Sequence, residues 1–225
     1  LLLGCKNTID KNALNQAEKI NYPVIMGRAE QKDGHIFDRF LFLVRSGIFK
    51  NNKATTFFIS KSNFESVPKG TTIFLCEKKL FLESQVDNKD SRHCSDDTKL
   101  LWNIVQKQKI LSTNKIKCNY HTRKTLKANI KHIYNRGPKF VDYYYKPSKI
   151  YFWLINLIII FIILLLYQGI RYQLLAETLG IILIADTLLS IFISRKLNDI
   201  PVVFILFRLF SIAFFSGIIK GLVVK

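Results

Sequence analysis

Two adjacent carboxylates are the residues of this sequence whose types and spacing most favour catalysis. Asp96 and Asp97 follow Ser95 and precede the apolar positions Leu100 and Leu101. A carboxylate at the start of a helix, beside a cleft in which a hydroxyl loses its proton, is what a general base requires. The same two acids could instead only cap the helix and complement its dipole. On spacing alone, both interpretations stand.

Other candidate binding residues lie on either side of this acidic pair. Gly70-Thr71-Thr72 enters a predicted strand, where a glycine lets backbone N–H groups approach a ligand closely; a simple turn is the alternative. His121 and Arg123 follow another predicted strand, a position from which binding residues often project. Arg136 and Gly137 are predicted to end a helix as a C-cap, and Arg136 could face phosphate or lipid. Taken singly, each also suits a solvated surface residue.

The elements that position these residues alternate in an α/β order. Runs of β-branched and aromatic residues predict strands, and apolar residues three or four positions apart predict helices. In chain order, the sequence predicts a strand at 1–4, a helix at 13–20, a strand at 23–26 closed by Gly27, a helix at 36–45, strands at 55–60 and 71–76, helices at 77–83 and 96–105, and strands beginning at Ile110 and at Ile116. A basic amphipathic helix at 124–136 could then lie in the plane of a membrane interface.

The last third of the chain is predicted to enter a membrane. Residues 150–167, 174–194 and 200–219 are apolar runs, each long enough to cross roughly 30 Å of hydrocarbon at 1.5 Å per residue. They predict a bundle of three transmembrane helices. Asp186 and Arg208 lie inside these runs, where charge is costly and is usually paired or functional. They are predicted to form an ion pair that fixes the helices, and a transport pathway is the alternative.

The positive charge of the chain is concentrated ahead of the membrane runs. Residues 1–149 hold 28 Lys and Arg against 13 Asp and Glu, and the segment 105–149 holds twelve basic residues against Asp142 alone. This segment, the basic collar, suits anionic headgroups or pyrophosphates, since each cation near an acidic bilayer contributes about 1 kcal/mol. Nucleic acid is not expected as a partner, because the sequence has no zinc-finger, homeodomain or RNA-recognition signature.

Charges also predict which side of the membrane the soluble part occupies. The first loop between apolar runs carries Arg171 alone, whereas the second carries Arg195 and Lys196, and Lys146 and Lys149 precede the first run. Basic loops stay in the cytoplasm, so the soluble part and the second loop are predicted to be cytoplasmic.

Cysteine usage and the first residue carry two further expectations. The cysteines show no C-x-x-C pair and are predicted to be free thiols, with a zinc site as the alternative; they are Cys5, Cys76, Cys94 and Cys118. The chain opens on Leu1 in what reads as a buried strand, and the expectation is that it is a fragment of a longer protein.

The order of these segments resembles family 2 glycosyltransferases. The stretch Gly70-Thr71-Thr72-Ile73-Phe74-Leu75-Cys76-Glu77-Lys78-Lys79-Leu80-Phe81 is similar to the family's "G-T, strand, R-R/E-x-x-hydrophobic" segment. Asp96-Asp97-Thr98-Lys99-Leu100 resembles its "E/D-D-x-x-L" motif. Residues 120–126 and 131–137 resemble the "Y/H-x-x-R-x-(S/T)-L … Q-x-x-x-x-G" segment of membrane-bound members that build bacterial exopolysaccharides. The resemblance covers most of the chain from about Val24.

The resemblance implies a fold, a division into domains and a role for each site residue. Residues 1–122 would be the C-terminal part of a GT-A domain, a Rossmann-like α/β sandwich; 123–149 would be a basic interfacial helix and linker, and 150–225 three transmembrane helices. Asp97 would be the catalytic base and Asp96 would flank it. The remaining positions would bind substrate: the strand that starts at Gly70-Thr71-Thr72 would line the sugar and acceptor pocket, and His121, Arg123 and Arg136 would bind the diphosphate or a lipid-linked acceptor.

Three departures from the family pattern affect the expected donor site, cofactor and product. The family's first half, which holds the nucleotide base, is expected to be missing from this fragment. The family holds Mg²⁺ or Mn²⁺ through a D-x-D motif, but the matching position reads Cys5-Lys6-Asn7-Thr8. A divalent ion would lack its carboxylate ligands there, so no metal-binding residues are predicted and Lys6 is a candidate to replace part of the charge. The processive Q-x-x-R-W signature is also missing, which favours transfer of a single sugar.

The sequence therefore predicts an inverting glycosyltransferase at the cytoplasmic face of a membrane. Its expected partners are a nucleotide-sugar donor, a lipid-linked or exopolysaccharide acceptor and membrane lipids. The alternative is a non-catalytic membrane protein whose basic collar binds anionic lipid or a partner protein.

Overall fold

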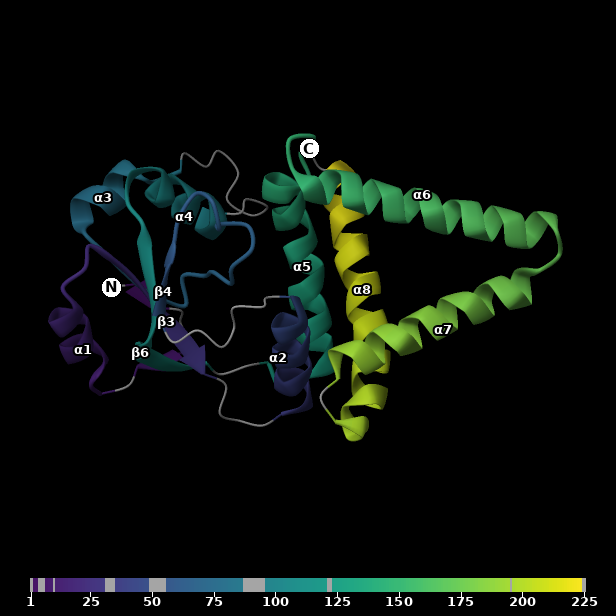
Figure 1. Cartoon of the computed structure of the whole chain (residues 1–225), viewed down its shortest axis with the longest axis horizontal. Coiled ribbons are helices and arrows are strands. Elements are labelled where there is room, and N and C mark those ends of the chain that lie inside the picture. Colours follow the sequence, from purple (N-terminus) through teal and green to yellow (C-terminus); the bar gives the residue numbers. More distant parts are fainter. Residues whose placement is uncertain are drawn as a thin grey trace. The chain divides into compact units, whose positions relative to one another are not determined.

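The computed structural model describes residues 2–3, 7–9, 11–30, 35–48, 56–86, 96–120, 123–194 and 196–223. The chain divides into two compact units, Leu1–Leu126 and Lys127–Lys225, whose elements are labelled in Figure 1. The first unit is mixed α/β, and the second contains three long apolar helices. Both features confirm the sequence-based expectation at this level of detail.

A mixed sheet forms the centre of the first unit. Its longer strands are β3 (Val24–Glu30), β4 (Thr56–Ile59), β5 (Ile73–Cys76) and β6 (Ile110–Tyr120), and the short strands β1 (Leu2–Leu3) and β2 (Asn7–Ile9) extend it in the order β1-β5-β3-β6-β2. β6 runs parallel to β3 on one side. On the other side it is antiparallel to β4 along its first half and to β2 along its second half. The two strands predicted at Ile110 and Ile116 are therefore one strand, because different partners pair with its two halves.

β3 continues past Gly27, the residue predicted to close it. The register between β3 and β6 shifts between Met26 and Arg28. A Cβ atom on Gly27 would lie 2.6 Å from Cγ2 of Ile73 and 2.8 Å from the carbonyl oxygen of Ile116. A glycine is thus needed here for close approach at an irregular point of the sheet, and it does not mark a strand end.

Among its described residues, the first unit has the helices α1 (Ala13–Ile20), α2 (Ile36–Ile48), α3 (Lys78–Glu83) and α4 (Asp96–Lys107). α1 packs its small residues Ala13 and Ala17 on apolar side chains of the sheet, among them Ile25 and Ile116. α4 buries Leu101, Ile104 and Val105. Helical spacing of apolar residues predicted α1, α2 and α4, because a helix of a small domain buries one stripe of its surface.

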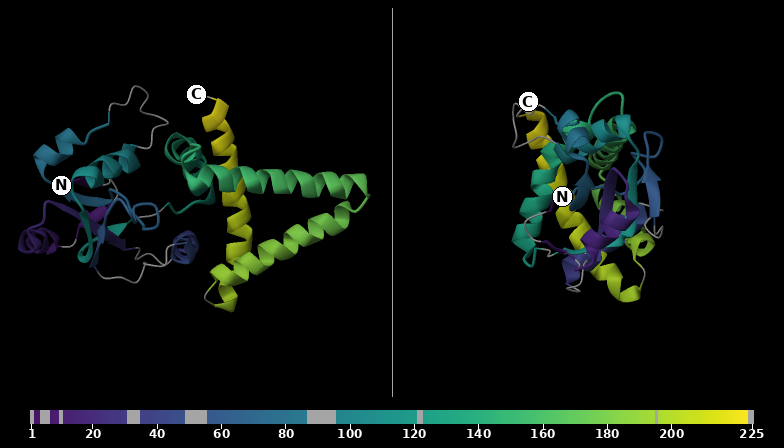
Figure 2. Two further views of the ribbon diagram at one scale, coloured as in Figure 1. Left: turned by 45° about the horizontal axis from the view of Figure 1, so that its top comes forward. Right: turned by 90° about the vertical axis from the view of Figure 1, so that its left-hand side faces the viewer.

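The second unit consists of α5 (Leu126–Tyr144), α6 (Ile150–Arg171), α7 (Leu175–Ile193), the short 3₁₀ turn η2 (Leu197–Asp199) and α8 (Ile200–Val223). The segments α6, α7 and η2 with α8 are long and apolar enough to cross a membrane, and 6%, 11% and 33% of their most apolar windows are buried. α6 and α7 form a hairpin that extends away from α5 and α8 (Figures 1 and 2). Its turn places Gln173 at a φ of 56°.

α5 does not end at Arg136-Gly137, so the predicted C-cap there is wrong. The helix continues through Pro138 to Tyr144, although Pro138 has no N–H to donate to the carbonyl of Tyr134. A Cβ atom on Gly137 would overlap the backbone of Gly217 in α8, and one on Gly217 would overlap the Tyr134 carbonyl oxygen. The two helix backbones touch directly, and this packing stabilises α5 across the Gly-Pro pair.

The glycine contact predicts a strong position dependence of alanine substitutions. Gly217→Ala is expected to destabilise the second unit by about 1 to 3 kcal/mol, because its Cβ has no space beside Tyr134. Gly180→Ala in α7 is the matched control, since a Cβ there meets nothing within 4 Å. Melting temperatures in detergent measure both. A Gly217→Ala protein as stable as the Gly180→Ala protein would contradict the close packing of α5 on α8.

Candidate functional site

The predicted catalytic base lies at an exposed helix start. Asp97 is the second residue of α4 and its side chain is exposed; the side chain of Asp96 lies outside the described part of the chain. The buried stripe of α4 begins four residues later at Leu101. Asp97 therefore lies at the exposed end of a helix whose following turns are packed. Its role as a base stays a prediction.

The glycine-threonine segment directly precedes β5, as predicted. Gly70, Thr71 and Thr72 are all partly buried. The Gly70 N–H donates a weak hydrogen bond to Sδ of Met26 at 3.4 Å, which ties the segment to β3. A Cβ on Gly70 would meet only Oγ1 of Thr72, at 4.0 Å. No crowding requires glycine at this position, and the segment's predicted contact with substrate is untested.

The three basic candidates fall in different places. Arg123 is partly buried and lies between β6 and α5 in the first unit, whereas Arg136 is exposed on α5 in the second unit. His121 lies outside the described residues. The structure therefore brings Asp97 and the Gly70 segment into one unit and leaves Arg136 in the other.

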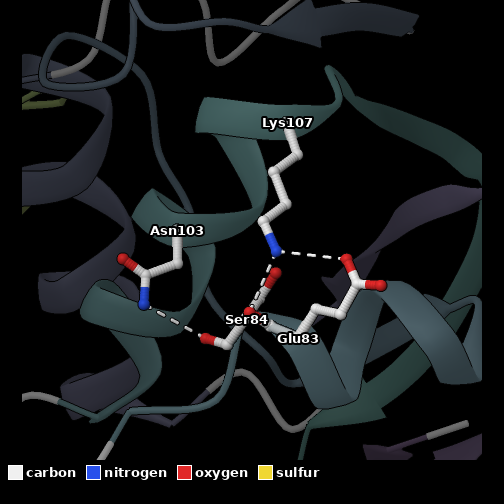
Figure 3. Close-up of polar contacts among 4 residues, drawn as sticks. All are labelled: Glu83, Ser84, Asn103 and Lys107. Atoms are coloured by element: carbon white, nitrogen blue, oxygen red, sulfur yellow. Dashed lines mark hydrogen bonds and ion pairs between the residues drawn. The ribbon is translucent and has the colours of Figure 1, made fainter.

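Two polar side chains on the second half of α4 hold the end of α3 (Figure 3). Nδ2 of Asn103 donates to the carbonyl of Ser84 at 3.2 Å. Nζ of Lys107 donates to the carbonyl of Glu83 at 3.0 Å and pairs with its carboxylate at 3.2 Å. The last carbonyls of a helix lack partners within it, and α4 satisfies two of them for α3. α4 is thus anchored by its C-terminal half, and Asp97 near its other end is exposed.

A cavity of about 500 Å³ lies at the anchored end of α4, in the first unit. Lys107 follows Asp97 by ten residues, so the cavity is about 15 Å from Asp97 along the helix axis. The lining groups are mostly basic or hydroxyl-bearing: Tyr22, Ser60, Lys61, Ser62, Val105, Lys107, Gln108 and Lys109. Nε2 of Gln108 donates to the Tyr22 hydroxyl at 2.9 Å, and the hydroxyls of Ser60 and Ser62 are 2.9 Å apart.

This open pocket was not predicted from the sequence; lysines and hydroxyls line it, and one of its three lysines, Lys107, already pairs with Glu83. Ammonium and hydroxyl groups donate hydrogen bonds to phosphate or carboxylate oxygens. Lys107 and Lys109 were noticed only as part of the basic collar, and Lys61 is 46 residues earlier in the chain. The separation explains why no sequence motif marks the cavity: strand pairing of β4 with β6 brings Ser60 beside Lys109.

The described residues contain no group of three or more His, Cys, Asp or Glu side chains that could hold a metal ion. Cys76 and Cys118 are free thiols, whereas Cys5 and Cys94 lie outside the described residues. Burial raises the pKa of Cys76 to about 11, with the neighbouring Glu77 charge adding to the effect, and burial also raises the pKa of Cys118. Both thiols are therefore poorly nucleophilic near neutral pH.

Slow alkylation of these two cysteines is the expected consequence. A pKa of about 11 in place of 9.0 leaves roughly a hundredth of the ordinary thiolate fraction at pH 8 for Cys76. Iodoacetamide labelling of the folded protein, read residue by residue by mass spectrometry, should be correspondingly slow for Cys76 and should accelerate up to pH 11. Labelling of Cys76 at the rate of a free cysteine would contradict its burial.

The predicted ion pair between the apolar helices is confirmed. Nε of Arg208 in α8 donates to Oδ2 of Asp186 in α7 at 2.9 Å. The Arg208 guanidinium also lies 4.0 Å from the centre of the Phe204 ring. Pairing and the ring contact lower the cost of keeping both charges in an apolar helix pair.

Exchanging the charges of Asp186 and Arg208 tests whether this ion pair only stabilises the helices or takes part in transport. Asp186→Asn leaves Arg208 without its carboxylate and should lower the stability of the second unit by about 1 kcal/mol. The double variant Asp186→Arg with Arg208→Asp should recover most of that loss in a detergent melting experiment. If the exchanged pair recovers nothing, or if Asp186→Asn alters solute flux in proteoliposomes, the pair is not a purely structural one.

No protein-family profile, no curated protein and no solved structure matches the chain.

Proposed function

We propose that this chain belongs to an inverting glycosyltransferase of the family 2 type. It transfers one sugar from a nucleotide-sugar donor to a lipid-linked or exopolysaccharide acceptor at the cytoplasmic face of a membrane. The observation that carries the proposal is the order in which the resembling segments fall on elements. Gly70-Thr71-Thr72 precedes β5, the acidic pair begins α4, and β6 leads through Arg123 into α5 and the apolar helices.

Asp97 is proposed as the base because it occupies the second acid of the resembling motif; it does not line the pocket at the other end of α4. Its carboxylate is exposed at the start of α4, so an acceptor hydroxyl can reach it from solvent. In the proposed reaction, Asp97 takes the hydroxyl proton while the hydroxyl oxygen bonds to the anomeric carbon. The bond from that carbon to the diphosphate oxygen breaks on the opposite face, and the nucleoside diphosphate leaves with the electron pair. Asp96 flanks the acceptor position.

A divalent ion does not fit the residues that stand in the family's metal position. Cys5-Lys6-Asn7 offers no carboxylate, and the described residues hold no other cluster of metal-binding side chains. No described residue is therefore proposed as a metal ligand. Charge on the leaving diphosphate is met instead by cations of the first unit, for which Lys6 and Arg123 are the candidates, and Gly70-Thr71-Thr72 is proposed to line the sugar pocket.

Removal of the Asp97 carboxylate tests the proposal. Asp97→Asn in the full-length protein should reduce transfer of radiolabelled sugar from nucleotide sugars to membrane lipid extract by about 100-fold or more, the usual worth of a general base. Glu18→Gln on the exposed face of α1 is the matched control and should keep full activity. Membrane content and melting temperature should be unchanged in both. Undiminished transfer by Asp97→Asn would reject the base assignment.

A non-catalytic lipid-binding protein is the second candidate, and one observation favours it. Four cations, Lys127, Lys131, Arg136 and Lys139, are all exposed on α5, as a helix that binds anionic headgroups requires. The same preparation distinguishes the two functions. Transfer from any nucleotide sugar supports the enzyme, whereas no transfer from a full panel, with strong binding to vesicles rich in phosphatidylserine, supports the lipid-binding protein.

A further inference from the structure

α5 fixes the depth of the C-terminal end of α8. Gly217 and Gly221 of α8 contact the α5 backbone so closely that a Cβ on Gly221 would lie 2.7 Å from the Cα of Pro138. Nζ of Lys220 lies 5.5 Å from the ring of Tyr134. Two of the four exposed cations of α5, Arg136 and Lys139, lie on the stretch that contacts α8. A helix this polar cannot enter hydrocarbon, so the end of α8 that touches it lies at the membrane surface.

The beginning of α6 lies at that same surface. Ile155 of α6, Val141 of α5 and Ile218 of α8 form one buried cluster. Ile155 is five residues after the start of α6, and Ile218 is five residues before the end of α8. The start of α6 and the end of α8 are thus each within about 8 Å of this shared cluster, measured along their own helix. Whichever face of the membrane α6 enters, the last turns of α8 lie on that face too.

The α6–α7 hairpin has the features of a membrane-inserted pair. α6 is about 33 Å long and α7 about 28 Å long, close to the thickness of the hydrocarbon. α6 begins with Tyr151 and Trp153 and ends with Tyr167 and Arg171, the aromatic and basic residues that mark the two interfaces. Little of either helix is buried, and the hairpin extends away from α5 and α8 (Figures 1 and 2).

We infer that α8 does not cross the membrane and lies along its surface. If α6 crosses outward and α7 returns, α8 begins on the face from which α6 entered. The cluster of Ile155 with Ile218 places the end of α8 on that face as well. α8 is one continuous helix whose only proline, Pro201, is in its first turn, where proline is tolerated. A straight helix with both ends on one face lies in the interface, with α6 running across it (Figure 2).

The surface of α8 and its charges agree with this position. Its large exposed apolar side chains would contact the acyl-chain border; they are Ile205, Leu209, Ile212, Phe215, Ile219, Leu222 and Val223. In a transmembrane orientation, Arg208 would be about 12 Å from the start of the helix, near the centre of the hydrocarbon. Its guanidinium stays paired with Asp186 of α7 in either orientation, and an α8 at the surface holds that pair nearer the headgroups. The basic residues Lys196 and Lys220 then both stay on the cytoplasmic side, as the charge rule requires.

The side of the membrane on which the C-terminus lies distinguishes an α8 that crosses the membrane from an α8 that lies along its surface. Three full-length chains each carry one short epitope, inserted between Pro147 and Ser148, after Gln173, or after Lys225. Antibody access is measured in sealed vesicles of both orientations. The epitopes at 147 and 225 should be accessible in the same vesicles, and the one at 173 in the opposite ones. If the epitope at 225 is accessible in the same vesicles as the epitope at 173, α8 crosses the membrane and the inference is overturned. If the epitope at 173 is accessible in the same vesicles as the epitope at 147, the α6–α7 hairpin does not cross, and the inference is overturned too.

Fluorescence depth measurements test the in-plane position independently. In a Trp102→Phe, Trp153→Phe background, single tryptophans replace Ile205, Ile212 or Ile219, whose side chains are 57%, 67% and 62% exposed. Lipids brominated near the headgroup should quench all three to a similar extent and more strongly than lipids brominated deep in the chain. Strongest quenching of Ile212→Trp by the deep bromines would show a spanning helix. Neither measurement depends on glycosyl transfer, so the inference can fail while the proposed enzyme stands.

Discussion

Backbone contact between α5 and α8 is the constraint on which the second unit depends. No layer of side chains separates the two helices at Gly137, Gly217 and Gly221. The polar helix α5 and the apolar helix α8 must therefore lie at the same depth relative to the membrane. An apolar helix by itself would be free to cross the bilayer, since its composition favours insertion. The small residues at the crossing point couple its position to that of α5 and, through Ile155, to the start of α6.

The first unit gives the two ends of α4 opposite chemistry. Its C-terminal half is held by the contacts of Asn103 and Lys107 with the end of α3, and it borders a cavity lined by lysines and hydroxyls. Its N-terminal end presents Asp97 to solvent. A carboxylate suits a reacting hydroxyl and a basic cavity suits an anion, and the length of the helix keeps the two separate. The proposed sugar transfer places its base at the acidic end, and the basic end is available for a different charged group.

Local patterns predicted most elements because each depends on neighbours in the sequence. The stripe of Leu101, Ile104 and Val105 marks α4, and the β-branched and aromatic residues of 55–60 and 71–76 mark β4 and β5. The pair of Asp186 with Arg208 was predictable because an apolar helix offers a charge few other partners. Predictions failed at Gly27 and at Gly137, which read as breaks in the sequence but are points of close backbone approach to residues far along the chain.

The candidate site likewise has features that depend on local sequence and features that depend on contacts between distant residues. Sequence alone determined the residue types that can do acid–base chemistry at Asp96 and Asp97, the excess of positive charge ahead of the membrane and the length of the apolar runs, since composition and spacing set these properties. Only the tertiary structure decided that Asp97 is exposed at the start of an anchored helix, that Lys61 joins Lys107 and Lys109 around one cavity, and that α5 lies against α8. Strand pairing and helix crossing bring together residues tens of positions apart, and no local pattern encodes those distances.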